Sequence, residues 1–387
     1  MNDIAKVWWH ELGEVFHDGG IIIFVIILPL FYPLLYAIVY GTEVARDVPI
    51  AIVDDSHTAL SRSFVRAIDA CPETQVFAKC ANMSDARHLL MKRDVYGIVH
   101  IPTTFESDIR DGRQTYVGAY SDVSSMIYYK NLLLPCTNVS LEFNRNIKID
   151  KLSSAMSDRE QAVAKMPIDY QHVMLYNPQG GFDSFILPPV LMLIVQQAML
   201  LGIGMAMGRV RENNHGYAVP QSLSTVNPLK IIFGKLFFYV PLFVVLALYM
   251  HIGVTHMFRL PELGHYLTAI AFLIPYVVAC CLLGLSLSAF LYRREDTILL
   301  FVFMSVPLLF LSGVSWPGSN MPLFWKIFGS IFPSTYGLPA YVRISSMGAT
   351  ISDVSPEMIH IWILIAVYFI ISCIFTSRQM SRIRRQN

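Results

Sequence analysis

Two adjacent acids occupy a position where carboxylates often do chemistry. Asp54 and Asp55 follow an apolar, β-branched run at 49–53, and paired carboxylates at the end of a strand can bind a metal ion or act as acid and base. We find no histidine or third acid at a recognised metal-ligand spacing. Aspartate also commonly ends a strand in a turn. We therefore interpret the pair as a strand-terminating turn and predict no metal site.

Signatures of the common ATP-binding and hydrolytic sites are missing from the sequence. There is no G-x-x-x-x-G-K-[ST] phosphate-binding loop and no G-x-S-x-G nucleophile elbow. The pair His10–Glu11 is not followed by a second histidine at the metalloprotease spacing. We therefore predict that the chain is not an enzyme, with no catalytic residues and no cofactor of its own.

The cysteines leave two interpretations open. Cys71 and Cys80 lie in a polar part of the chain, where a disulfide and a pair of buried thiols are both compatible with the sequence. The other four are Cys136, Cys280, Cys281 and Cys373. Their spacing does not indicate a metal site.

Apolar stretches dominate the chain. Hydrophobic residues fill 54% of the 387 positions and charged residues only 15%, against about 25% in ordinary soluble domains. A helix that crosses a bilayer needs about 20 apolar residues. Six stretches qualify, approximately 21–40, 185–207, 236–255, 267–292, 298–316 and 359–376. We predict an α-helical polytopic membrane protein with six transmembrane helices. The net charge of +1 argues against nucleic acid as a partner.

Arginines and lysines indicate the orientation. They gather in the connection 208–235, at 293–294 and in the basic tail 378–387, and such segments lie on the cytoplasmic side of a membrane. Both termini are then cytoplasmic. The first span, 21–42, is too long for the apolar region of a signal peptide, so we expect a retained anchor.

Few polar side chains fall inside the spans. Gln196, Gln197 and His251 are the main candidates, and we interpret the glutamines as hydrogen-bonding between helices. Ion-coupled transporters keep ionisable residues within the membrane. With no acid there, a transport function would need energy from another chain.

The segment 43–183 resembles a soluble domain inserted between the first two spans. Strand patterns at 49–56, 74–80, 95–102 and 115–122 alternate with helical patterns at 60–71, 84–93, 103–111 and 124–165. This alternation predicts a βαβ-type sheet. With the orientation above, the segment is an extracytoplasmic α/β domain.

Residues 1–20 have the pattern of a helix that lies in the membrane interface. Six apolar side chains share roughly one helical face, namely Ile4, Val7, Trp8, Leu12, Val15 and Phe16.

Three segments together resemble the permease subunit of a bacterial type-2 ABC exporter, in the branch with a large extracytoplasmic domain between helices one and two. They are WWHELGEVFHDGG at 8–20, GRVRENNHGYAVPQSLSTVNPLKIIFGKL at 208–236 and LSGVSWPGSNMPLFWKIFGSIFPSTYGLPAYVRI at 311–344. The first is similar to the cytoplasmic elbow helix of that family.

The resemblance implies that the connection 208–235 is the coupling loop that docks on an ATPase subunit. Its family-like positions are Arg211, Glu212, Gly216, Pro220, Pro228, Gly234 and Lys235. The family's Thr-x-Glu after the glycine is replaced by Tyr217, Ala218 and Val219.

The run 311–344 implies a re-entrant gate region at 312–343, in which Gly and Pro break helices that face protein. The residues that match the family pattern are Ser312, Gly313, Pro317, Met321, Pro322, Pro333, Thr335, Tyr336 and Arg343.

The sequence therefore predicts a permease subunit in a bacterial cytoplasmic (inner) membrane that exports a lipophilic or amphipathic cargo. The expected partners are ABC ATPase subunits that carry ATP and Mg²⁺, a second permease chain (identical or paralogous), the lipid bilayer and a periplasmic adaptor. The alternative is a membrane-anchored surface protein whose domain at 43–183 binds envelope or phage partners. The sequence does not identify the cargo or the substrate-binding residues.

Overall fold

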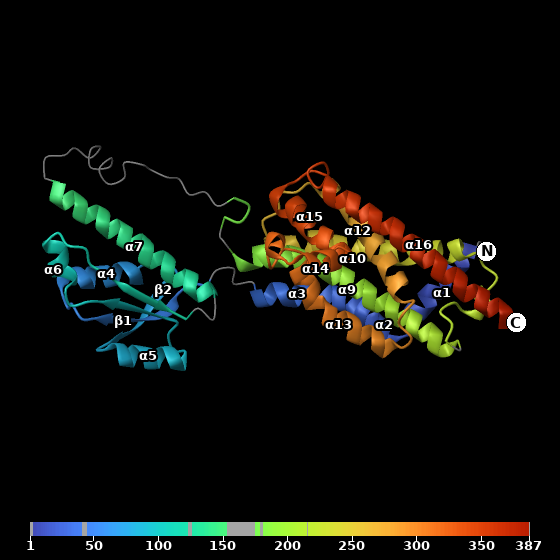
Figure 1. Cartoon of the computed structure of the whole chain (residues 1–387), viewed down its shortest axis with the longest axis horizontal. Coiled ribbons are helices and arrows are strands. Elements are labelled where there is room, and N and C mark those ends of the chain that lie inside the picture. Colours follow the sequence, from blue (N-terminus) through green and yellow to red (C-terminus); the bar gives the residue numbers. More distant parts are fainter. Residues whose placement is uncertain are drawn as a thin grey trace. The chain divides into compact units, whose positions relative to one another are not determined.

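The computed structural model describes residues 3–40, 45–122, 126–152, 175–178, 181–214 and 216–386. The chain forms two compact units (Figure 1). The sheet unit comprises Val44–Val173, and the helical unit comprises Met1–Glu43 with Met174–Asn387.

The sheet unit contains a four-stranded sheet with the order β2-β1-β3-β4. Its strands are β1 (Val48–Asp54), β2 (Thr74–Cys80), β3 (Gly97–Ile101) and β4 (Gly118–Ser121). Strand β1 runs parallel to β2 and β3, and β4 pairs antiparallel to β3. All four strands lie where the sequence predicts them.

Helices cover both faces of this sheet because successive side chains of a strand point to opposite faces. Ile50 and Ile52 pack with the side chains of α4 (Ala59–Asp69) and α7 (Met126–Leu152). Ala51 and Val53 pack with α5 (Met83–Lys92). A short helix, α6 (Phe105–Arg110), precedes β4. The predicted long helix 124–165 corresponds to α7, and its part beyond Leu152 lies outside the described residues.

The cysteines of the sheet unit are free thiols. Cys71 packs on the core that contains Ile50 and Ile52, whereas Cys80 packs on the core of the other sheet face. Burial raises the pKa of both thiols. The structure therefore favours separate thiols over a Cys71–Cys80 disulfide.

The acid pair is a turn, as predicted. Asp54 accepts hydrogen bonds from the backbone amides of Ser56 and His57 at 3.1 and 3.2 Å and from the Ser61 hydroxyl at 2.7 Å. His100 Nε2, on the neighbouring strand β3, lies 2.8 Å from Asp55 Oδ2. Across the described residues, no three His, Cys, Asp or Glu side chains are grouped to hold a metal ion.

The helical unit is built almost entirely from helices. They are α1 (Asp3–Phe16), α2 (Gly19–Ile22), η1 (Ile23–Ile27), α3 (Leu28–Tyr40), α9 (Phe182–Asn213), η2 (Gln221–Leu223), α10 (Pro228–Leu248), η3 (Tyr249–Val254), α11 (Thr255–Met257), α12 (Tyr266–Leu287), α13 (Arg294–Leu311), η4 (Gly318–Asn320), α14 (Leu323–Gly329), α15 (Pro333–Met347) and α16 (Ser355–Gln386).

Five helical segments in the described part of the chain are long and apolar enough to cross a membrane. They are Gly19–Val39, Phe182–Asn213, Pro228–Met257, Tyr266–Leu287 and Ser355–Arg384. The sixth predicted span, 298–316, corresponds to α13, whose 18 residues begin with the charged turn 294–296. These charges shorten the apolar part of α13, so this helix is not among the five segments above. The count of six spans therefore stays a prediction.

Helix α9 forms the centre of the helical unit. Its apolar window is completely buried, and two glycines on one of its faces allow α13 to approach closely. A Cβ atom at Gly204 would lie 2.4 Å from Thr297 Cγ2, and one at Gly208 would lie 3.1 Å from the Arg294 backbone nitrogen. Small residues at such positions let two membrane helices pack backbone to backbone.

One end of the helical unit gathers the basic residues, and we call it the arginine end. Arg294 at the start of α13 contacts Asp18, which precedes α2. Arg211 at the end of α9 contacts Ala289, just after α12. Arg384 of α16 bonds Ser224 of the connection between α9 and α10. The basic connections and the basic tail therefore lie together at this end of the helical unit, as the distribution of arginines and lysines along the sequence predicts.

Candidate functional site

A buried ion pair fastens the N-terminal helix α1 to α10. Val7, Glu11 and Val15 lie one turn apart and are all buried. Although Glu11 is only 2% exposed, its carboxylate is fully engaged. It accepts hydrogen bonds from Lys235 Nζ and, at 3.0 Å, from the Tyr239 hydroxyl.

Close packing surrounds this pair. A Cβ atom at Gly234 would lie 2.6 Å from Val7 Cβ, so α10 contacts α1 at the level of its backbone. The Trp8 and Phe238 rings meet edge to face at 5.9 Å. Helix α1 is therefore an integral layer of the bundle and not a loose leader.

A second set of charges ties the same segment to α9 and α13. Asp18 Oδ1 accepts from the Gly20 amide at 2.9 Å and so caps α2. Asp18 Oδ2 lies 2.7 Å from Arg294 and 3.4 Å from Arg209. Arg209 also lies 3.4 Å from Glu14. Three separate parts of the chain therefore meet at one carboxylate.

The predicted coupling residues divide into two groups. Arg211 is 2% exposed, donates to the backbone carbonyls of Leu291 and Ala289 and stacks on the Tyr292 ring at 5.0 Å. Its guanidinium therefore forms its contacts inside the protein, where it stabilises the turn between α12 and α13. Glu212 lies 2.9 Å from Arg294 in the same region.

The other two predicted residues shape the connection itself. The Gly216 amide donates to the Arg211 carbonyl at 2.9 Å with φ +87°, a conformation that glycine adopts without strain. Pro220 is half-buried and directly precedes η2.

The connection packs with both ends of the chain. Val219, Leu223 and Val226 form one apolar cluster with Val7 and with Met380 and Ile383 of α16. We call α1, residues 216–227 and residues 378–384 together the platform. Its exposed side chains include Ser222, Thr225, Arg378 and Arg382.

The predicted gate residues lie at helix ends. Ser312 follows α13, and Gly313 has φ +82°. Pro317 and Met321 flank η4, while Pro322 precedes α14 and Pro333 begins α15. Because proline fits the first turn of a helix but not its interior, these positions define where the short helices start.

The turn between α14 and α15 reaches the middle of the bundle. The Ser334 amide donates to Gln196 Oε1 at 2.9 Å, and Gln196 Nε2 donates to the Ser334 hydroxyl at 3.1 Å. The Tyr368 hydroxyl donates to the Ile331 carbonyl. Gln196 and Tyr368 lie near the midpoints of the 32-residue helices α9 and α16. The segment therefore enters and leaves the bundle from the same end.

The two glutamines of α9 differ. The interhelical hydrogen bonds predicted for them are confirmed for Gln196. Both polar atoms of the Gln197 side chain are buried without a hydrogen-bond partner in the described residues. An unpaired amide in apolar surroundings costs free energy, so Gln197 is a position where a polar group from outside the chain would be stabilised.

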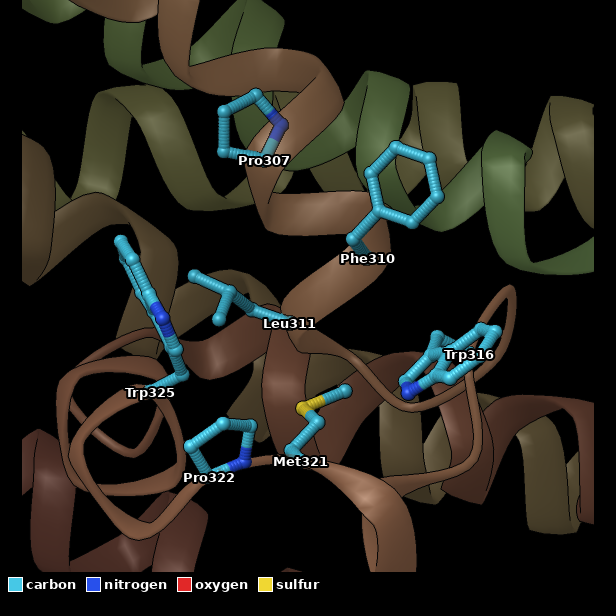
Figure 2. Close-up of a pocket in the computed structure, with 7 residues that line it drawn as sticks. All are labelled: Pro307, Phe310, Leu311, Trp316, Met321, Pro322 and Trp325. Atoms are coloured by element: carbon cyan, nitrogen blue, oxygen red, sulfur yellow. The ribbon is translucent and has the colours of Figure 1, made fainter.

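We call residues 312–343 the re-entrant segment. A cavity of about 330 Å³ lies where α13 meets this segment. Figure 2 shows Met321 and Leu311 between the indole rings of Trp316 and Trp325. The other lining residues are Pro307, Phe310 and Pro322. The predicted residue Tyr336 lies elsewhere and stacks on the His360 ring at 4.5 Å. The cavity is apolar and therefore suits a hydrocarbon group.

Sequence patterns did not single out the Glu11–Lys235 pair. One signal was present, because Glu11 falls within the apolar stripe of α1, between Val7 and Val15. A charge in that position needs a partner, but the sequence alone does not say which cation supplies it.

Comparison with known proteins gives two matches. The family model described as ABC-2 family transporter protein matches residues 20–374. ABC transporter G family member 23 of Dictyostelium discoideum is 20% identical over 353 residues, which cover 90% of this chain and 48% of that protein. The chain thus spans about half the length of that relative.

We predict that the two members of the buried Glu11–Lys235 ion pair depend on each other for the stability of the protein. Lys235→Met leaves the Glu11 carboxylate buried without a cation and should lower the free energy of unfolding by about 3–5 kcal/mol. The double variant E11Q/K235M removes both charges and should recover most of that loss. Denaturation in mixed micelles measures both.

Lys230→Met is the matched control, because Lys230 pairs with Asp3 at 2.8 Å in an exposed ion pair on the same two helices. It should leave stability unchanged. Equal losses from K235M and from the double variant would show that the pair itself is not what holds α1.

Proposed function

This chain belongs to the ABC-2 family of transporter proteins, and we propose that it is the membrane-spanning subunit of an ATP-driven exporter. The family is the transmembrane component of such transporters and typically works with a separate ABC ATPase subunit. The observation that carries the proposal is the family match, because it includes both the helical unit and the inserted sheet unit.

The platform is the proposed docking site for the ATPase. It combines α1, the connection between α9 and α10 and the end of α16 in one apolar cluster. A push on residues 216–227 would therefore act on α1 at the same time. Because Glu11 and Lys235 fasten α1 to α10, we infer that α1 and α10 move as one rigid lever. A second permease chain would complete the translocation path.

The arginine end is the proposed cytoplasmic side. Its exposed arginines, Arg378 and Arg382, support this orientation by the positive-inside rule. The chain leaves α3 and enters α9 at the opposite end of the helical unit, which supports an extracytoplasmic position for the sheet unit. The proposed location is a bacterial inner membrane, with α13 as the sixth crossing.

The proposed cargo is lipophilic or amphipathic. Support comes from the apolar cavity at Met321 and Trp325 and from the unpaired amide of Gln197. The cavity offers a surface for hydrocarbon, and Gln197, which does not line that cavity, offers a buried hydrogen-bonding position on α9.

Sidedness can be tested with single cysteines at Ser352 and Thr225, both of which are exposed at opposite ends of the helical unit. In intact cells a membrane-impermeant maleimide should label S352C and leave T225C unlabelled until the membrane is permeabilised. Labelling of T225C in intact cells would refute the orientation.

Docking of the ATPase subunit can be tested at the platform. Because Ser222 is exposed on the platform, a photocrosslinker attached to S222C should capture the co-expressed ATPase subunit. S352C carrying the same reagent is the control and should capture none. An S222C variant that never crosslinks in an active complex would move the docking site elsewhere.

The cargo proposal predicts that filling the cavity reduces binding. Met321→Trp adds volume between Trp316 and Trp325, so a lipophilic fluorophore should bind the purified protein at least several-fold more weakly. Leu323→Trp, at an exposed position nearby (72% exposed), is the control. Unchanged binding in M321W would show that this cavity does not receive lipophilic compounds.

A further inference from the structure

A polar cluster outside the platform lies at the end of the bundle opposite the arginine end. His251 is 1% exposed and lies on η3, a π-helical turn at Tyr249–Val254. Its Nδ1 is 2.9 Å from the Tyr341 hydroxyl of α15, and its Nε2 is 3.1 Å from Glu262 Oε1. Such π-helical turns frequently occur at functional sites.

Glu262 belongs to the loop between α11 and α12. Its side chain is 14% exposed, and Oε1, the carboxyl oxygen that faces His251, is buried. Burial raises its pKa, against the opposing effects of the Thr255 hydroxyl and His256. Thr255 Oγ1 lies 3.5 Å from the second carboxyl oxygen.

The loop that carries Glu262 is joined directly to the re-entrant segment. The amides of Leu263 and Gly264 both donate to the Ser345 carbonyl of α15, at 3.0 and 3.1 Å. A Cβ atom at Gly264 would lie 2.3 Å from the Ile344 carbonyl oxygen, so the two backbones touch. A change at Glu262 can therefore act on α15 through the backbone contacts of the next two residues.

The protonation state of the cluster decides how well it holds together. An imidazolium facing a carboxylate and a neutral imidazole facing a carboxylic acid both contain one exchangeable proton between His251 and Glu262 and carry no net charge. Without that proton, a carboxylate faces a neutral ring in a largely buried position, which is costly. The two groups titrate as a pair.

The loop between α11 and α12 also carries the exposed Arg259 and His265, but neither is among the groups that shift the pKa of Glu262. The Tyr266 ring of α12 lies 5.9 Å from the His251 ring, and His256 acts on Glu262 from α11. Arg343 of α15 is paired with Glu357 at 2.7 Å. Asp183 of α9, the other buried carboxyl near this end, accepts from the Ser184 amide at 2.6 Å.

We propose that His251, Glu262 and Tyr341 form a proton-binding site that fastens the loop 258–265 to α15, the second helix of the re-entrant segment. Proton uptake tightens this contact and proton loss loosens it. The site thus gives the re-entrant segment a sensitivity to pH. That this is the pH outside the cell rests on the proposed orientation, whereas the site itself does not.

Hydrogen–deuterium exchange of the purified full chain, corrected for intrinsic exchange rates, tests the proposal. Protection of the peptide that contains Leu263 and Gly264 should be roughly tenfold greater at pH 6 than at pH 8, the effect of one pKa unit of linked proton binding. Glu262→Gln cannot lose a proton, so its protection should be high and equal at both pH values.

His256→Gln removes an exposed neighbour on the adjacent helix α11 that acts on Glu262. Because His256 also lowers the pKa of Glu262, H256Q should shift the pH response without abolishing it, whereas His265→Gln, at an exposed position of the loop that carries Glu262, should keep the wild-type response. A pH-independent wild type, or an E262Q variant that retains the full response, would overturn the proposal. Both comparisons use proteins without large packing changes and need neither ATPase nor cargo, so their failure would leave the proposed function untouched.

Discussion

The arrangement of the helical unit depends on the burial of one charge pair. Glu11 and Lys235 come from helices far apart in the sequence, and each is buried only because the other is present. Removing two charges from water is costly, and the cost is offset only when the pair and its remaining hydrogen bonds are complete. Tyr239 supplies the further bond to Glu11. The position of α1 is therefore specified by chemistry as well as by apolar packing.

The same rule explains the re-entrant segment. Short helices within the bundle expose backbone groups at their ends, and these groups need partners where water is scarce. Gln196 accepts from the Ser334 amide at the start of α15, and Tyr368 donates to the Ile331 carbonyl just before it. Two polar side chains on long helices thus offset the cost of one break at mid-depth.

Local patterns in the sequence predicted much of this fold. The strands of the sheet unit and the breaks at Pro322 and Pro333 depend on neighbouring residues, and the structure has them where those residues indicate. Partners distant in the sequence could not be predicted in this way. The coupling role of Arg211 stays a prediction, and no local pattern indicated that its guanidinium donates to the carbonyls of Leu291 and Ala289 after α12. His100 joins Asp55 only because β3 lies beside β1 in the sheet.

The sixth span shows how composition can mislead about a boundary. The sequence placed it at 298–316, whereas α13 begins at Arg294 and ends at Leu311. Asp296 accepts from the Arg293 amide at 3.1 Å and so caps the start of the helix, while Gly313 with its positive φ follows the end. Capping and backbone conformation determine where α13 begins and ends, and a hydropathy pattern contains information on neither of them.

The central claim is that α1 and α10 act as one lever. Trp8 and Phe238 are in ring contact across this boundary, so cysteines at these two positions can be joined by a short reducible crosslinker in a chain without its native cysteines. The measurement is ATP hydrolysis and export by the reconstituted complex before and after crosslinking. The account predicts that both activities persist when the two helices are joined. Loss of both on crosslinking, with recovery on reduction, would show that α1 must move against α10 and would contradict it.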